Sequence, residues 1–130
     1  CPGRGVVNRT ILVCDDNELL VELLSFRLEN KGYRVLIAPD GAQAVALAEQ
    51  HLPDAIILDT MMPVMDGQLV LRRLRSQTET AAIPVIMLTA RKQQRDIVDA
   101  FDLGASDYLV KPFIPEELMM RLARLLPELK

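Results

Sequence analysis

The segment TILVCDDNELLVELLSFRLENKGYRVLIA, residues 10–38, carries the pattern that decides the fold. A short apolar run at 10–15 predicts a strand, and leucines at helical spacing predict a helix over 17–31. A second apolar run at 33–38 predicts another strand. Two strands joined through one helix form a βαβ unit, in which the strands run parallel.

The same alternation continues to the end of the chain. Because the strand segments are apolar at successive positions, they are typical of a parallel sheet covered by helices on both faces. The sequence therefore predicts a doubly wound (βα)5 domain over 10–126. Residues 1–9 are expected to be a tag remnant, linker or disordered segment, and 127–130 a tail. The further expected elements are strands at 55–59, 85–89 and 108–110 and helices at 40–50, 68–76, 92–102 and 115–126.

Residues typical of helix ends support these boundaries. Asn17 and Asp40 suit N-caps, Gly32 suits the residue just past a helix, and Pro115 suits a first turn. Phe26 is interpreted as a core or loop anchor. The residues expected on buried helix stripes are Leu20, Leu23, Leu24 and Leu28, then Ala42, Val45, Ala46 and Ala48, and finally Leu118, Leu122, Leu125 and Leu126.

The composition argues against a nucleic-acid-binding, a disulfide-rich or a membrane-spanning protein. The 130 residues carry a net charge of −3, which gives no reason to expect nucleic-acid binding, because phosphate neutralisation needs clustered Lys and Arg. Cys1 and Cys14 are too few for a disulfide framework, so a cytoplasmic protein is the default expectation. No apolar stretch approaches the roughly 18 residues of a membrane span.

Five polar residues end the predicted strands. Asp15 and Asp16 follow the first strand, Asp59 ends the third, Thr89 ends the fourth and Lys111 ends the fifth. The carboxyl ends of parallel strands meet at one edge of the sheet, where such folds bind ligands. Taken singly, Asp15 and Asp16 could cap a helix and Lys111 could be a solvated loop charge. Together the five suit a divalent cation and a phosphoryl group.

The motifs around these residues resemble those of response-regulator receiver domains, the phospho-accepting modules of two-component signalling. The resemblance covers roughly residues 10–126. It implies a flavodoxin-like sandwich with a five-stranded parallel sheet in the order 2-1-3-4-5. The motifs that carry it are DD at 15–16, DTMMP at 59–63, MDG at 65–67, LTA at 88–90 and GASDYLVKPF at 104–113.

The resemblance implies a role for each strand-end residue. Asp59 would accept a phosphoryl group from a sensor histidine kinase or a phosphotransfer protein. Mg²⁺ or Mn²⁺ would bind Asp16 and Asp59 directly, Asp15 through water, and the backbone carbonyl of Met61. Lys111 would pair with a phosphoryl oxygen. Such a protein is a switch rather than an enzyme, since it catalyses only its own phosphorylation and dephosphorylation.

Thr89 and Tyr108 are expected to relay the phosphorylated state. By resemblance, Thr89 moves toward the phosphoryl group and Tyr108 turns into the vacated space. This would repack the face formed by the fourth helix, the fifth strand and the last helix.

That face is also where many receivers form homodimers. Asp102, Asp107, Glu117 and Arg121 match the charged positions of this dimer, whereas Ile97 and Ala123 stand where that subfamily usually has basic residues.

In receivers, the side chains at the positions of Met61 and Arg91 influence how fast the phosphorylated aspartate is hydrolysed. Neither side chain carries a carboxylate or amide that could orient an attacking water, so slow dephosphorylation is expected.

Two alternative functions remain open. A receiver-like interaction module would work without phosphorylation, and intact Asp59, Thr89 and Lys111 speak against it. A haloacid-dehalogenase-type phosphatase needs a second aspartate two residues after the nucleophile, where this chain has Met61.

Overall fold

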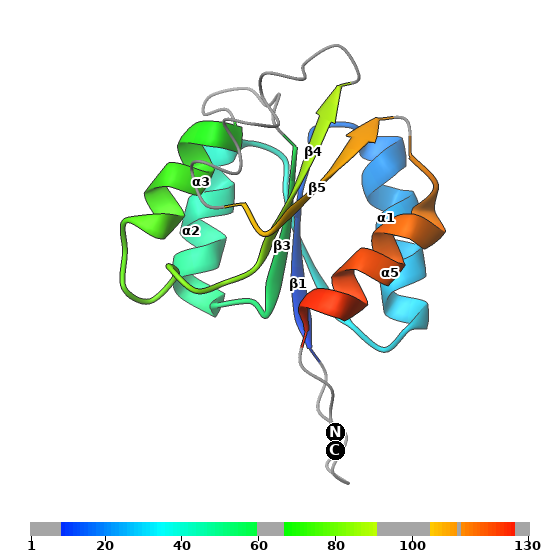
Figure 1. The fold of residues 1–130 in the computed structure, drawn as a ribbon, viewed down its shortest axis with the longest axis horizontal. Helices are drawn as coiled ribbons and strands as arrows, with labels where there is room; N and C mark the ends of the chain where they lie inside the picture. The colour runs from blue at the N-terminus through cyan, green and yellow to red at the C-terminus, as the bar shows by residue number, and fades with distance from the viewer. Residues whose placement is uncertain (1–8, 60–66, 91–104, 112, 127–130) are drawn as a thin grey trace, which may run out of the picture.

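Five parallel strands form the centre of the protein, here described from a computed structural model (Figure 1). The structure describes residues 9–59, 67–90, 105–111 and 113–126. Its elements are β1 (Thr10–Cys14), α1 (Glu18–Asn30), β2 (Arg34–Ala38), α2 (Gly41–His51), β3 (Ala55–Asp59), α3 (Gly67–Arg75), β4 (Val85–Ala90), β5 (Asp107–Lys111) and α5 (Pro115–Leu125).

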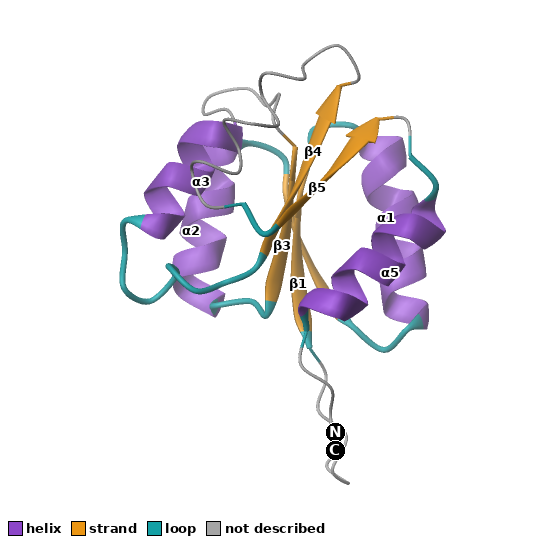
Figure 2. Ribbon diagram, viewed as in Figure 1, coloured by secondary structure: helices purple, strands orange, loops and turns teal. Residues whose placement is uncertain are grey.

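The strand order is β2-β1-β3-β4-β5, and every neighbouring pair is parallel. This confirms the expected doubly wound sheet in the order 2-1-3-4-5. α1 and α5 cover one face of the sheet, and α2 and α3 cover the other (Figure 2). The helix expected at 92–102 lies outside the described residues, as do residues 1–8 and 127–130. No helix in the described ranges is long and apolar enough to cross a bilayer.

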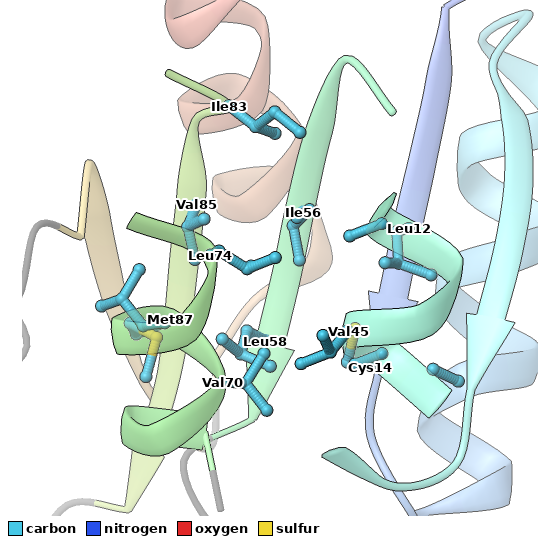
Figure 3. Packing of buried hydrophobic residues seen from close by; sticks show 14 of the residues in the cluster. Leu12, Cys14, Val45, Ile56, Leu58, Val70, Leu74, Ile83, Val85 and Met87 are labelled. Atoms are coloured by element: carbon cyan, nitrogen blue, oxygen red, sulfur yellow. The ribbon is translucent and has the colours of Figure 1, made fainter. Parts of the chain in front are cut away.

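Alternate residues of each central strand enter two separate hydrophobic clusters. In β1, Leu12 and Cys14 pack toward α2 and α3, whereas Ile11 and Val13 pack toward α1 and α5. Figure 3 shows the first cluster, in which Leu58 on β3 lies among side chains of the neighbouring elements. Because both faces are covered, all five residues of β3 are buried. The core therefore fixes the position of the strand end at which Asp59 lies.

The predicted helix ends are confirmed. Oδ1 of Asn17 accepts hydrogen bonds from two backbone N–H groups of α1, and Oδ1 of Asp40 accepts one from Gln43. Gly32 has a φ of +94°, which glycine adopts without strain after a helix. Pro115 occupies the first turn of α5.

Two of the predicted buried stripes need correction. In α1, Val21 is buried with Leu24 and Leu28, whereas Leu23 is 41% exposed and Phe26 is 65% exposed. In α2, the expected Ala42 and Ala46 are exposed, and the buried residues are Gly41, Ala44, Val45 and Ala48. Apolar residues lie around much of both helices, so spacing alone did not identify the face toward the sheet. The α5 stripe is confirmed, with Leu118, Leu122 and Leu126 buried and Leu125 partly buried.

Candidate functional site

Three carboxylates meet at the carboxyl-terminal edge of the sheet. Asp15 and Asp16 follow β1, and Asp59 ends the neighbouring strand β3. One ligand atom from each of the three lies within 4.8 Å of the others. Asp15 is 2% exposed and Asp59 is 4% exposed, whereas Asp16 is open to solvent. The predicted acidic cluster is therefore present, and two of its members lie almost entirely inside the protein.

Lys111 brings a positive charge to the same point from β5. Its Nζ atom lies 3.0 Å from Oδ2 of Asp15 and 3.4 Å from Oδ2 of Asp59. A lone carboxylate in this position would be costly to bury, and the ammonium, which lies close to both, offsets part of their combined charge. The interpretation of Lys111 as a solvated loop charge is therefore wrong. In this structure its partners are the carboxylates themselves.

Asp15 is held by both of its carboxylate oxygens. Oδ1 accepts a hydrogen bond from the backbone N–H of Asn17 at 2.9 Å, and Oδ2 accepts one from the ammonium of Lys111. Asn17 therefore has a second role that was not predicted from the sequence. Its backbone N–H holds the carboxylate of Asp15, while its side chain caps α1. An aspartate two residues before an asparagine at a strand end is the signal that could have indicated this Asx turn.

Thr89 and Tyr108 lie on the neighbouring strands β4 and β5. Thr89 is 1% exposed near the end of β4, the strand between β3 and β5. Tyr108 is opposite Met87 in the register of β4 and β5. It packs against the hydrophobic cluster between the sheet and helices α2 and α3. Since Thr89 is two residues beyond Met87, Thr89 and Tyr108 share one face of the sheet.

The acidic cluster suits a hard divalent cation. Oxygens around Mg²⁺ lie about 2 Å from the ion, so they are separated from one another by roughly 3–4 Å, which the three carboxylates can meet. Cys14 is not a competing ligand. Its complete burial, with the charge of Asp15 adding to the effect, raises the pKa of the thiol, which stays protonated. The carbonyl of Met61 lies outside the described residues.

Three of the four charged residues expected on the dimer face form ion pairs within the chain, in which Arg121 contacts both Asp107 and Glu117. Nη1 of Arg121 lies 2.9 and 3.1 Å from the two carboxylate oxygens of Asp107, and Nη2 lies 3.0 Å from Oε2 of Glu117. Hydrogen bonds to Glu117 and then to Asp107 raise the pKa of Arg121. Of the remaining predicted site residues, Arg91, Ile97 and Asp102 lie outside the described residues.

Comparison with known proteins identifies the family. The model of the response regulator receiver domain matches residues 11–123. The chain belongs to this family. It is thus a receiver domain of two-component response regulators, whose general function is Mg²⁺-dependent acceptance of a phosphoryl group.

A curated relative extends the comparison to longer proteins. The DNA-binding dual master transcriptional regulator RpaA of Synechocystis is 49% identical over 116 residues, which are 89% of this chain and 48% of that protein. The chain spans about half the length of the curated relatives it matches.

Two solved structures resemble the protein over nearly its whole length. Chemotaxis response regulator CheY4 of Vibrio cholerae is 35% identical with a TM-score of 0.86, over 92% of this chain and 100% of that one. The receiver domain of sensor histidine kinase PA1611 from Pseudomonas aeruginosa is 38% identical with a TM-score of 0.84, over 92% and 98%. The PA1611 domain was crystallised with a magnesium ion coordinated in its active-site cleft.

Proposed function

We propose that Asp59 is the phosphoacceptor and that the donor is a phosphohistidine of a sensor kinase or phosphotransfer protein. A carboxylate oxygen of Asp59 attacks the phosphorus, the phosphorus–nitrogen bond breaks, and the imidazole leaves with a proton. The observation that carries the proposal is the meeting of Asp15, Asp16 and Asp59 with Lys111 at one sheet edge. Phosphoryl transfer needs mainly positioning and charge neutralisation, and this arrangement supplies both.

The burial and hydrogen bonds of the carboxylates suggest which of them bind the cation directly. Asp16 is exposed and offers its oxygens to a cation, whereas both oxygens of Asp15 already accept hydrogen bonds. Asp16 and Asp59 are therefore assigned as direct ligands, with Asp15 acting through water. A bound Mg²⁺ or Mn²⁺ neutralises charge on the transferring phosphoryl group. The carbonyl of Met61 completes the proposed ligand set.

Lys111 changes partner during the reaction in this scheme. Before transfer, its ammonium lies against Asp15 and Asp59. Once Asp59 carries the phosphoryl group, the nearest negative charge is a phosphoryl oxygen, and Lys111 follows it. Because Lys111 ends β5, this movement links the chemistry to the strand that carries Tyr108.

Thr89 and Tyr108 are the proposed relay to the surface. Thr89 is buried between the strands of Asp59 and Lys111, so its hydroxyl can turn to a new phosphoryl oxygen with little backbone movement. Tyr108 shares the same face of the sheet and is only partly buried. Its ring can therefore change position when Thr89 moves.

The proposed output is homodimerisation through the face that includes β5 and α5. Asp107, Glu117 and Arg121 are charged groups on this face, and they pair within one chain here. A dimer would exchange these pairs for intermolecular ones, so it gains affinity only if repacking around Tyr108 loosens the internal pairs. Ile97 and Asp102 complete the proposed surface.

Intact-mass measurement after treatment with acetyl phosphate and MgCl₂ tests the phosphoacceptor. The parent should gain one phosphoryl group, and none when the divalent cation is chelated. Asp59→Asn should gain none. Asp54→Asn is the matched control, because it makes the same change just before the opposite end of β3, where Oδ2 of Asp54 accepts the N–H of Thr10. A parent that gains no phosphate from any donor would favour the interaction module that works without phosphorylation.

A further inference from the structure

An apolar pocket adjoins the acidic cluster. Its volume is about 460 Å³, and it lies between the start of α1 and the residues around the start of α5. Concave sites of this volume with mainly apolar walls are where proteins hold small molecules. The described residues that line the pocket are Asn17, Leu20, Leu23, Lys111, Phe113 and Pro115.

Two of the lining residues also hold the buried carboxylates. Nζ of Lys111 lies 3.4 Å from Oδ2 of Asp59 and 3.0 Å from Oδ2 of Asp15. The backbone N–H of Asn17 donates a hydrogen bond to the other oxygen of Asp15. A molecule in the pocket therefore contacts the residues that fix the acidic cluster, next to the proposed nucleophile.

The pocket combines one positive charge with apolar walls. Lys111 is the only charged residue among the described residues that line it, and the Lys111 side chain is 28% exposed. The side-chain oxygen of Asn17 already accepts two hydrogen bonds from backbone N–H groups of α1. Leucine, phenylalanine and proline side chains make up the rest of the described lining. Such a site suits an apolar chain that is attached to an anionic group.

We propose that this pocket binds the acyl chain of small acyl phosphates that donate a phosphoryl group to Asp59, an inference that rests on Asp59 being the phosphoacceptor. A carboxylate oxygen of Asp59 attacks the phosphorus, and the bond between the phosphorus and the bridging oxygen breaks. The acyl group leaves as a carboxylate, which keeps the bonding electrons and needs no proton. It departs on the side of the phosphorus opposite Asp59, from which its chain reaches the pocket.

The size of the pocket favours chains longer than that of acetyl phosphate. Butyryl phosphate carries two more CH₂ groups, and each is worth up to about fourfold in binding when it is fully buried. Leu23 is 41% exposed, so a bound chain stays partly hydrated. We therefore expect butyryl phosphate to react at least about threefold faster than acetyl phosphate. Acetic and butyric acids are nearly equal in strength, so the two leaving groups are matched and the rate difference reports the chain.

Initial rates of labelling with the two donors, at equal concentration with MgCl₂ and followed by intact mass, test the subsite. The ratio of the butyryl to the acetyl rate should be at least about three in the parent. It should fall to about one in Leu23→Asn, which makes the wall polar, and in Leu23→Trp, which fills the pocket. Leu69→Asn is the matched control, since Leu69 is a similarly exposed leucine on α3, and it should keep the parent's ratio.

Binding of hexanoate, which carries no phosphoryl group, tests the pocket apart from the chemistry. In a titration without phosphodonor, followed by methyl NMR, the resonances of Leu20 and Leu23 should shift and that of Leu69 should not. Shifts of equal size at all three leucines, or no shifts at all, would overturn the subsite.

The outcomes separate this inference from the assignment of the phosphoacceptor. If the parent reacts equally fast with both donors and Asp59→Asn gains no phosphate, the subsite is overturned while Asp59 remains the acceptor. A butyryl preference that persists in both Leu23 variants would overturn the subsite as well. If Leu23→Asn slowed transfer from a phosphohistidine protein but kept the butyryl preference, the pocket would serve the protein donor instead.

Discussion

Replacing Lys111 with Met should destabilise the protein in the absence of divalent cations. The Lys111 ammonium lies 3.0 and 3.4 Å from carboxylates of Asp15 and Asp59, which are almost completely buried. Removing one partner of a buried ion pair costs about 3–5 kcal/mol, because the remaining charge stays buried without compensation. The Lys111 side chain is 28% exposed, so solvent screens part of this, and Met keeps the apolar stem. We expect a loss of about 2 kcal/mol.

Urea unfolding with and without saturating MgCl₂ provides the assay. Mg²⁺ should stabilise Lys111→Met more than the parent, because the ion supplies the positive charge that the variant lacks. Lys31→Met is the control, since Lys31 is an exposed lysine at the end of α1, and it should change stability by less than about 0.5 kcal/mol. If Lys111→Met unfolds at the parent's urea concentration without Mg²⁺, the neutralising role of Lys111 is refuted. Equal stabilisation of both proteins by Mg²⁺ would refute it as well.

Three further predictions concern other parts of the chain. The double variant Met61→Asn plus Arg91→Glu should lose phosphate faster than the parent, because an amide and a carboxylate can orient water; equal rates measured by intact mass would contradict the role given to these two side chains. A hydrogen bond from Arg27 holds the pKa of Glu116 below its usual 4.5, so the pair's stabilisation is present above that pH and lost as the pH falls through the lowered pKa. In an NMR titration of dilute protein, Arg27→Gln should raise the pKa of Glu116, and an unchanged pKa would contradict the pairing. Thr80→Val should cost about 1–2 kcal/mol, because the buried hydroxyl donates to a carbonyl of α3 at 2.6 Å; Thr80→Ser should cost much less, and similar losses would point to packing instead.

The sequence predicted the fold because its local and long-range signals agree. The central strands are apolar at successive positions, which suits only strands covered on both faces, and the caps Asn17 and Asp40 place the helix starts. Burial around α1 was less predictable. Leu19, Leu23 and Phe26 continue the apolar surface beyond the side that packs on the sheet, and helical spacing does not show where packing stops.

The site was predictable in its members but not in its contacts. Parallel strands bring their carboxyl ends to one edge, so the meeting of Asp15 and Asp59 follows from the pattern alone. The contact between Lys111 and Asp15 joins residues 96 positions apart, and it depends on the strand order, which the resemblance implied. The internal pairing of Arg121 with Asp107 depends on how α5 crosses β5, and no local signal specifies that packing.

Locating the modified residue tests the central claim most directly. Borohydride reduces an aspartyl phosphate to homoserine, and peptide mass spectrometry then identifies the position. After treatment with acetyl phosphate and MgCl₂, the account predicts homoserine at residue 59 and at neither residue 15 nor residue 16. Homoserine at Asp15 or Asp16 in the parent, with Asp59 unmodified, would contradict it.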